Sequence, residues 1–195
     1  ICLPLHGRIQ GHKHHDVAVW ELPQDIVKSL HNCSFLTVHH ADRENQRPAK
    51  GTYYVFGYPE SLATADASRE KLTVNPFTFA TGIYEGDTDN LGDYDPKYHI
   101  LLDTPKEGGR RVDKGDMPIP TRIHGMSGCS IWQTYYKGLS TRHWTTDDAI
   151  IVAVQTGVYR DGTIVKGTRW WVVERIIREC YPKLEGPLSL LVPTA

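Results

Sequence analysis

Residues 124–132 read HGMSGCSIW, in which a serine lies between two glycines and an apolar run follows. Glycine adopts backbone conformations that other residues avoid, so Gly125 and Gly128 predict a sharp bend around Ser127. Such a bend leaves the serine hydroxyl exposed at its tip. The residues that follow predict a β-strand over residues 130–135. An ordinary loop before a strand has the same pattern, so the other segments of the chain must separate the two interpretations.

Short runs of β-branched and aromatic residues recur between glycine, proline and aspartate residues. Runs of this kind are typical of β-strands, and little helical sequence separates them. Many short strands with few helices predict antiparallel barrels or a sandwich, not a parallel α/β sheet. The predicted strands cover residues 16–22, 34–38, 52–56, 77–84, 98–102, 130–135 and 149–155. The first of these, DVAVWEL, is apolar on both faces and is predicted to be buried on both.

One segment near the C-terminus has helical periodicity. Apolar residues recur every three or four positions from Trp170 to Tyr181, with charged residues between them. This spacing predicts an amphipathic helix over residues 169–180 that stops before Pro182.

Three stretches are predicted to lack regular structure. Residues 85–97 and 103–118 are polar and rich in glycine and aspartate, which predicts long loops. The tail, residues 186–195, carries two prolines and is predicted to lie across the surface.

The composition narrows the class of protein. The chain has 195 residues, of which 39% are hydrophobic and 23% charged, as in an ordinary globular protein. A net charge of −1 argues against electrostatic binding to nucleic acids or membranes. No stretch approaches the ~20 apolar residues of a membrane-spanning helix. The 4 cysteines show no CxxC spacing and are too sparse for a disulfide scaffold, which favours a cytoplasmic over a secreted location.

Five segments of the chain occur in an order that is similar to a known family. They are DVAVWELP at 16–23, YVFGYP at 54–59, HGMSGCSIW at 124–132, VAVQTGV at 152–158 and the predicted C-terminal helix. This order resembles the trypsin-like (chymotrypsin-fold) serine peptidases, especially the divergent bacterial members, from about Asp16 to Cys180. The resemblance implies two antiparallel six-stranded β-barrels, with the first truncated and the helix packed against the second.

The resemblance also implies a division of the chain. Residues 1–195 would form a single peptidase domain. Within it, residues 1–50 would be the remainder of the first barrel, residues 51–185 the second barrel and its helix, and residues 186–195 a tail.

The family's chemistry assigns roles to residues of the bend. A serine hydroxyl needs a base to take its proton, and a carboxylate orients that base. Backbone N–H groups stabilise the oxyanion that forms on attack. By resemblance, Ser127 is the nucleophile, Asp16 is the orienting carboxylate, and the N–H groups of Gly125 and Ser127 form the oxyanion hole. No metal or organic cofactor is implied.

The substrate of such a domain is a peptide or protein. By resemblance, Gln155, Thr156 and Gly157 would pair with its backbone as an added strand. The floor of the specificity pocket would lie near Thr121. No acidic residue stands there, so a preference for Arg or Lys side chains is not supported.

Two positions depart from the family pattern. Met126 stands where digestive members have an aspartate that pairs with a newly cut N-terminus, so an Ile1 ammonium would have no such partner. The general-base histidine is not identified, because the histidines before Asp16 stand in no T-A-x-H turn. We expect that an N-terminal segment or a separate chain supplies it, that a nearby histidine substitutes, or that the domain has lost activity.

The last possibility leaves an alternative function open. A catalytically inactive domain of this kind would bind peptides or a partner protein along Gln155, Thr156 and Gly157. A third possibility is an unrelated esterase chemistry at Ser127, although the chain lacks the alternating strands and helices of an α/β-hydrolase.

Two further patterns suggest metal sites. His12 and His14 would lie on one face of a strand, with His39 or His40 as a third ligand. No cysteine or glutamate stands at a confirming spacing, so a loop of solvated histidines is the simpler interpretation. The acidic stretch DTDNLGDYD at 87–95 fails as a calcium loop, because Leu91 and Tyr98 stand where oxygen ligands are required.

Overall fold

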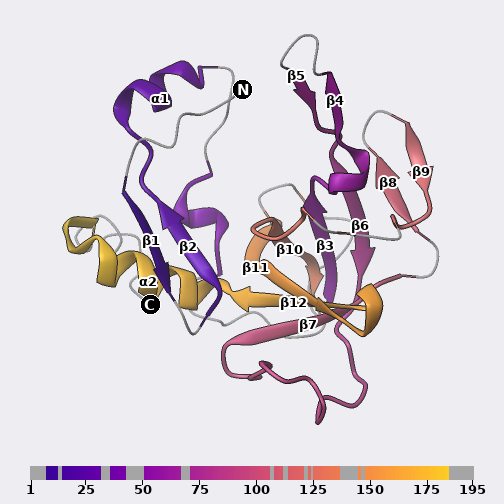
Figure 1. The fold of residues 1–195 in the computed structure, drawn as a ribbon. Helices are drawn as coiled ribbons and strands as arrows, with labels where there is room; N and C mark the ends of the chain where they lie inside the picture. Colours follow the sequence, from indigo (N-terminus) through magenta and orange to yellow (C-terminus); the bar gives the residue numbers. More distant parts are fainter. Residues whose placement is uncertain are drawn as a thin grey trace.

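The computed structural model describes residues 8–12, 15–31, 36–42, 51–66, 71–105, 108–111, 114–120, 123, 125–136, 145 and 148–184. The described chain is mostly β-sheet with one long C-terminal helix (Figure 1). The largest sheet has eight strands, in the order β7-β12-β11-β10-β3-β6-β8-β9, and all neighbours are antiparallel. They are β3 (Gly51–Gly57), β6 (Phe77–Thr81), β7 (His99–Asp103), β8 (Gly109–Arg111), β9 (Gly115–Met117), β10 (Ser130–Tyr136), β11 (Ile150–Tyr159) and β12 (Ile164–Arg169).

This sheet curls so that β7 lies beside the continuation of β6. Ile83 forms an antiparallel bridge with Leu102. The N–H of Tyr84 donates to the carbonyl of Leu101 at 3.0 Å, and the N–H of Asp103 donates to the carbonyl of Gly82 at 3.1 Å. Strand β7, at one end of the sheet order, is therefore hydrogen-bonded to the segment that follows β6.

The main hydrophobic core is built from alternate residues of these strands. Side chains two positions apart share one face of a strand, and the buried ones follow that spacing. The pairs are Tyr53 and Val55 on β3, Phe77 and Phe79 on β6, and Ile100 and Leu102 on β7. Ile131 of β10 and Val165 of β12 join the same cluster.

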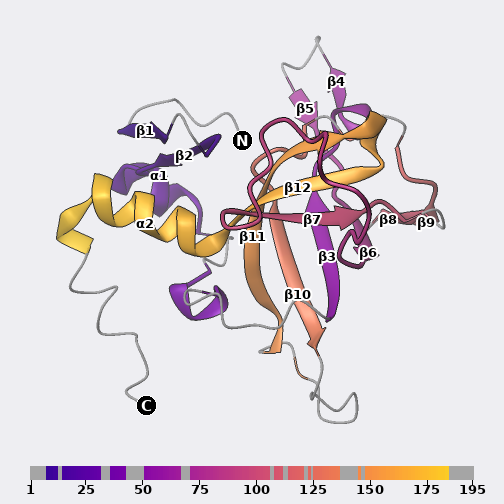
Figure 2. The same ribbon diagram turned by 90° about the horizontal axis from the view of Figure 1, so that it is seen from below.

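A smaller unit packs beside the large sheet. Strands β1 (Ile9–His12) and β2 (Val17–Trp20) form an antiparallel hairpin that lies against helix α2 (Trp170–Cys180), as Figures 1 and 2 show. Val17 is buried against three residues of the helix, namely Val172, Val173 and Ile176. Helix α1 (Gln24–Ser29) follows this hairpin.

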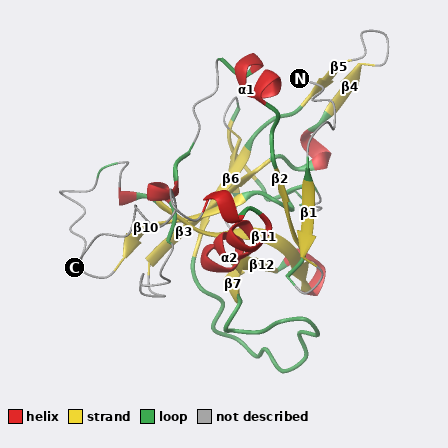
Figure 3. Cartoon of the chain, turned by 90° about the vertical axis from the view of Figure 1, so that its left-hand side faces the viewer, coloured by secondary structure: helices red, strands yellow, loops and turns green. Residues whose placement is uncertain are grey.

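The remaining regular elements are short. Strands β4 (Thr64–Asp66) and β5 (Lys71–Thr73) form a second two-stranded sheet. The 3₁₀ turns are η1 (Val38–His40), η2 (Glu60–Leu62), η6 (Arg160–Gly162) and η7 (Pro182–Leu184). Figure 3 shows β4 and β5 as strands and colours all helical segments red. Among the described residues, no helix is long and apolar enough to cross a membrane.

The structure confirms the predicted predominance of β-strands and the C-terminal helix, and it corrects several details. The predicted loop at 103–118 contains β8 and β9. In the predicted strand at 34–38, residues 36 and 37 are not in a strand and Val38 begins a 3₁₀ turn, while residues 34 and 35 lie outside the described part. Only Val17 of β2 is buried, Ala18 is exposed, and Val19 and Trp20 are half-buried, so the prediction of a strand buried on both faces is wrong. The tail 186–195 also lies outside the described residues.

Candidate functional site

The bend at Ser127 has the backbone that its two glycines predict. Gly125 and Gly128 have φ angles of +87° and +90°, in the left-handed region that favours glycine. Ser127 is exposed between them. Among the described residues, its hydroxyl has no hydrogen-bond partner, and no backbone hydrogen bond uses the N–H of Gly125 or Ser127. Within the described part of the chain, the hydroxyl and both predicted oxyanion donors are therefore not occupied by another residue.

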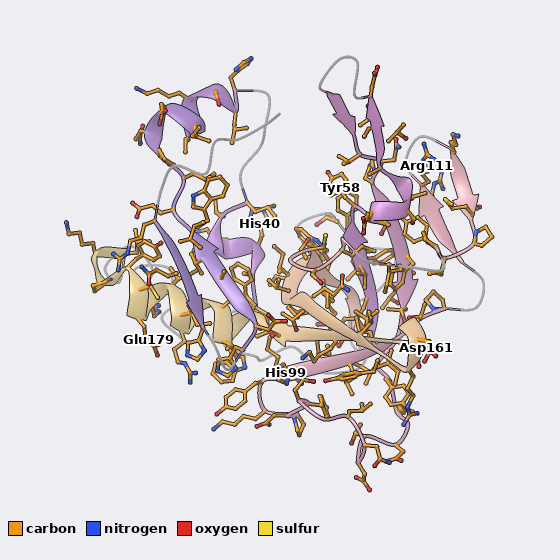
Figure 4. All side chains as sticks on the ribbon, in the orientation of Figure 1. His40, Tyr58, His99, Arg111, Asp161 and Glu179 are labelled. Carbon is orange, nitrogen blue, oxygen red and sulfur yellow. The ribbon has the colours of Figure 1, made fainter. Side chains whose placement is uncertain are left out.

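The segment that follows β3 packs closely against the bend. A Cβ atom placed on Gly125 would lie 2.9 Å from the backbone nitrogen of Glu60 and 3.1 Å from the carbonyl oxygen of Tyr58. Figure 4 shows Tyr58 on the segment where the chain leaves β3. Gly125 is therefore required twice, once by its φ angle and once by the close approach of this backbone.

Two side chains of the bend point into the protein. Met126 is 0% exposed and belongs to the main core, where it anchors the bend. Burial raises the pKa of the Cys129 thiol, although a hydrogen bond with the Tyr58 backbone lowers it by less. The thiol therefore stays protonated at neutral pH, and a protonated thiol is a poor nucleophile. Ser127 is the exposed nucleophilic side chain of this bend.

The bend is hydrogen-bonded to the predicted substrate strand. The N–H of Gly128 donates to the carbonyl of Gln155, and the N–H of Gln155 donates to the carbonyl of Cys129, both at 2.8 Å. Strand β10 pairs with β11 up to Val154, which lies opposite Ser130, and the pairing between these two strands ends there. The edge of β11 beyond Gln155 thus has no partner strand on this side within the described chain, while β12 pairs with its other side through Tyr159.

Asp16 lies at the turn of the β1–β2 hairpin, exposed and with φ of +49°. Hydrogen bonds connect this turn to the same strand. The buried Thr168 hydroxyl donates to the carbonyl of His15 at 3.1 Å and lies 3.2 Å from the Thr156 hydroxyl. The hairpin turn and the serine bend therefore both attach to the segment Gln155–Gly157. No hydrogen bond joins Asp16 to Ser127 in the part of the chain that the structure describes.

His15 corrects the interpretation of the histidine segment as a solvated loop. This residue is 6% exposed, and its ring stacks on His12 with a centroid distance of 4.6 Å. Its Nε2 atom lies 3.1 Å from the Arg175 guanidinium of α2. The described residues contain no cluster of three potential metal ligands among His, Cys, Asp and Glu. His14 and Thr121 lie outside the described residues.

The sequence did not identify Lys166, which lies beside the predicted substrate strand. Lys166 pairs in register with Gly157, and its side chain is 5% exposed. It forms an ion pair with Asp93, and Tyr159 donates a hydrogen bond to the same carboxylate. The hydrogen bonds from Lys166 and Tyr159 lower the pKa of Asp93. Lys166 could have been placed next to Gly157 only if β12 had been predicted as a strand. The sequence pattern did not indicate a strand there.

Two grooves lie elsewhere on the molecule. One, of about 690 Å³, is lined mainly by outward-facing residues of β3 and β10, including Tyr54, Phe56 and Trp132. The other, of about 710 Å³, lies between the β1–β2 hairpin and the end of α2. Neither contains Ser127, Asp16 or the segment Gln155–Gly157.

The site thus combines an exposed hydroxyl, two available N–H donors and an open strand edge. Groups of these kinds are the ones that peptide binding along a strand edge and stabilisation of an oxyanion require. Comparisons of the chain with protein-family models, with curated proteins and with solved structures found no match.

Proposed function

We propose that this chain is a serine peptidase domain that cleaves peptide bonds through an acyl-enzyme intermediate on Ser127. The observation that carries the proposal is the position of an exposed serine, on a glycine bend, next to the edge of β11 that no described strand pairs with. An extended substrate that adds to this edge would bring a peptide carbonyl to the hydroxyl. The hydrogen bonds between the bend and Gln155 hold the two parts in a fixed relation.

The proposed reaction has two steps. Ser127 attacks the peptide carbonyl while a histidine base accepts the hydroxyl proton, and the base then gives that proton to the leaving amine. Water next attacks the acyl ester while the same base accepts its proton, and the base returns that proton to the Ser127 oxygen as the ester bond breaks and the carboxyl product leaves. The N–H groups of Gly125 and Ser127 stabilise the oxyanion in both steps. Asp16 orients the base, which an N-terminal segment or a separate chain supplies.

The architecture supports this proposal at the level of the fold. We propose that β3, β6, β7, β12, β11 and β10 form the second barrel of a trypsin-like fold, closed where Ile83 bridges Leu102. The β1–β2 hairpin is then the remainder of the first barrel. In this arrangement the nucleophile comes from one barrel and the orienting carboxylate from the other.

One observation favours a second candidate function. The Ser127 hydroxyl has no hydrogen-bond partner among the described residues, so no base holds its proton there. An inactive domain would keep the β11 edge as a binding site for a peptide or a partner protein.

A fluorophosphonate probe distinguishes the two candidates, since it reacts covalently only with an activated serine. We expect the protein expressed from its full-length gene to be labelled, and the Ser127→Ala variant to lose all labelling. Ser130→Ala is the matched control, because Ser130 lies three residues along and its hydroxyl accepts a hydrogen bond from the Trp132 indole at 2.7 Å. Labelling that survives Ser127→Ala contradicts the proposal. A folded wild-type protein that takes no label supports the inactive binder.

A further inference from the structure

We propose that Lys166 makes the β11 edge selective for peptides that carry an acidic side chain next to Gly157. The inference rests on the proposed function in one respect, namely that a peptide binds along this edge. It does not require that the peptide be cleaved. The juxtaposition that carries it is a buried ammonium group beside a glycine of the substrate strand.

Gly157 lies directly beside the Lys166 side chain. A Cβ atom at this position would lie 3.3 Å from Cε and 3.9 Å from Nζ of Lys166, so any larger residue here would cover the ammonium group. Gly157 is partly exposed, and its φ angle is not in the left-handed region. The backbone does not require glycine here. Its lack of a side chain instead lets the buried Lys166 side chain lie over the Gly157 backbone, next to the strand along which a peptide would pair.

The Lys166 ammonium group pairs with the Asp93 carboxylate and lies 5.7 Å from the centroid of the Tyr159 ring. A lysine ammonium has three N–H donors, and in the described structure one hydrogen bond, to Asp93, is made. Asp93 is a loop residue whose side chain is 68% exposed, and Lys166, Tyr159 and its own backbone N–H donate hydrogen bonds to its carboxylate. A ligand carboxylate can take the remaining donors or displace Asp93. An amide of the same shape gains much less, because it carries no charge.

The selectivity can be measured by binding in the Ser127→Ala background, where no turnover occurs. The probes are acetyl-tetra-alanine amides with one Glu or one Gln at each of the four positions, titrated into labelled protein and followed by NMR. We expect the best Glu peptide to bind about tenfold more tightly than its Gln counterpart, which is the magnitude of a charge-assisted hydrogen bond. Lys166→Met should bring this ratio to about one, and the control Lys183→Met, on the exposed turn η7, should leave it unchanged.

A second variant keeps the inference testable if Lys166→Met does not fold. Asp93→Asn removes the competing carboxylate, so the preference for Glu over Gln should increase. Equal binding of Glu and Gln peptides by the wild-type and Asp93→Asn proteins overturns the inference about Lys166. Its failure is distinct from failure of the peptidase proposal, which the fluorophosphonate labelling tests separately. Acidic selectivity without labelling would support Lys166 in an inactive binding domain.

Discussion

Met126→Asp is expected to lower the free energy of unfolding by about 4 kcal/mol or more at pH 7. Met126 is 0% exposed and packs in the main core, so the substitution removes a buried side chain from a close-packed region. It also buries a carboxylate among apolar neighbours, where ionisation is strongly disfavoured. Urea denaturation at fixed pH measures the loss.

The pH dependence identifies the cause. Burial raises the pKa of the new carboxyl in the folded state above its unfolded value, so the destabilisation grows as the pH rises through that range and is smaller at pH 4 than at pH 7. Met126→Leu keeps the volume and is the control, with an expected loss below about 1.5 kcal/mol. A Met126→Asp protein as stable as the wild type at pH 7 would show that a cation meets this position.

Gly167→Val is the second substitution with a large expected effect. A Cβ atom at Gly167 would lie 2.5 Å from Cδ1 of Ile131, 3.1 Å from Cβ of Ala153 and 3.2 Å from Cγ2 of Ile100. These atoms belong to three different strands, so no single side chain can move aside to make room. Overpacking of this kind costs about 1–3 kcal/mol or more, and valine adds two further methyl groups. Thermal unfolding followed by circular dichroism measures the loss.

Gly82→Val is the matched control, because nothing lies within 4 Å of a Cβ atom there and its φ angle is ordinary. We expect its unfolding temperature to stay close to that of the wild type. If both variants were equally stable, Gly167 would not face the interior, and the curled arrangement of β7, β12, β11 and β10 would be wrong.

Strands with alternating apolar residues were predictable from the sequence. The run FTFAT places Phe77 and Phe79 on the core face, and burial of every second residue then follows from strand geometry. The helix at α2 was also predictable, because its apolar spacing matches the helical period. One of its buried residues, Glu174, was not expected inside, and Arg178 stabilises it through an ion pair of 2.8 Å.

Elements without such a pattern could not be predicted. Strand β12 reads IVKGTR and is almost wholly buried, yet its second half is polar or glycine. The polar side chains contact partners far away in the chain, such as Asp93 for Lys166 and the His15 carbonyl for Thr168. Strand β1, with the sequence IQGH, is defined mainly by its pairing with β2. Tertiary contacts decide these cases, and local sequence carries no signal for them.

The candidate site also has one part that was predictable from the sequence and one that was not. The glycine bend at Ser127 was predictable, because Gly125 and Gly128 need φ angles that few other residues adopt. The attachment of the Asp16 turn to β11 was not, since it passes through Thr168 and Thr156, which have no local motif. The role proposed for Asp16 came from the family resemblance, and it stays a prediction.

The central claim is that the Asp16 turn and the Ser127 bend face each other across the segment Gln155–Gly157. Paramagnetic relaxation measures this directly, with a nitroxide on Asp16→Cys in a chain whose 4 native cysteines are replaced by alanine. We predict strong broadening of the Ser127 and Gly128 amide signals, and none for Gly115 in β9, at the far end of the large sheet (Figure 1). Sharp Ser127 and Gly128 signals in the folded, labelled protein would place the two residues apart and contradict the proposed active site.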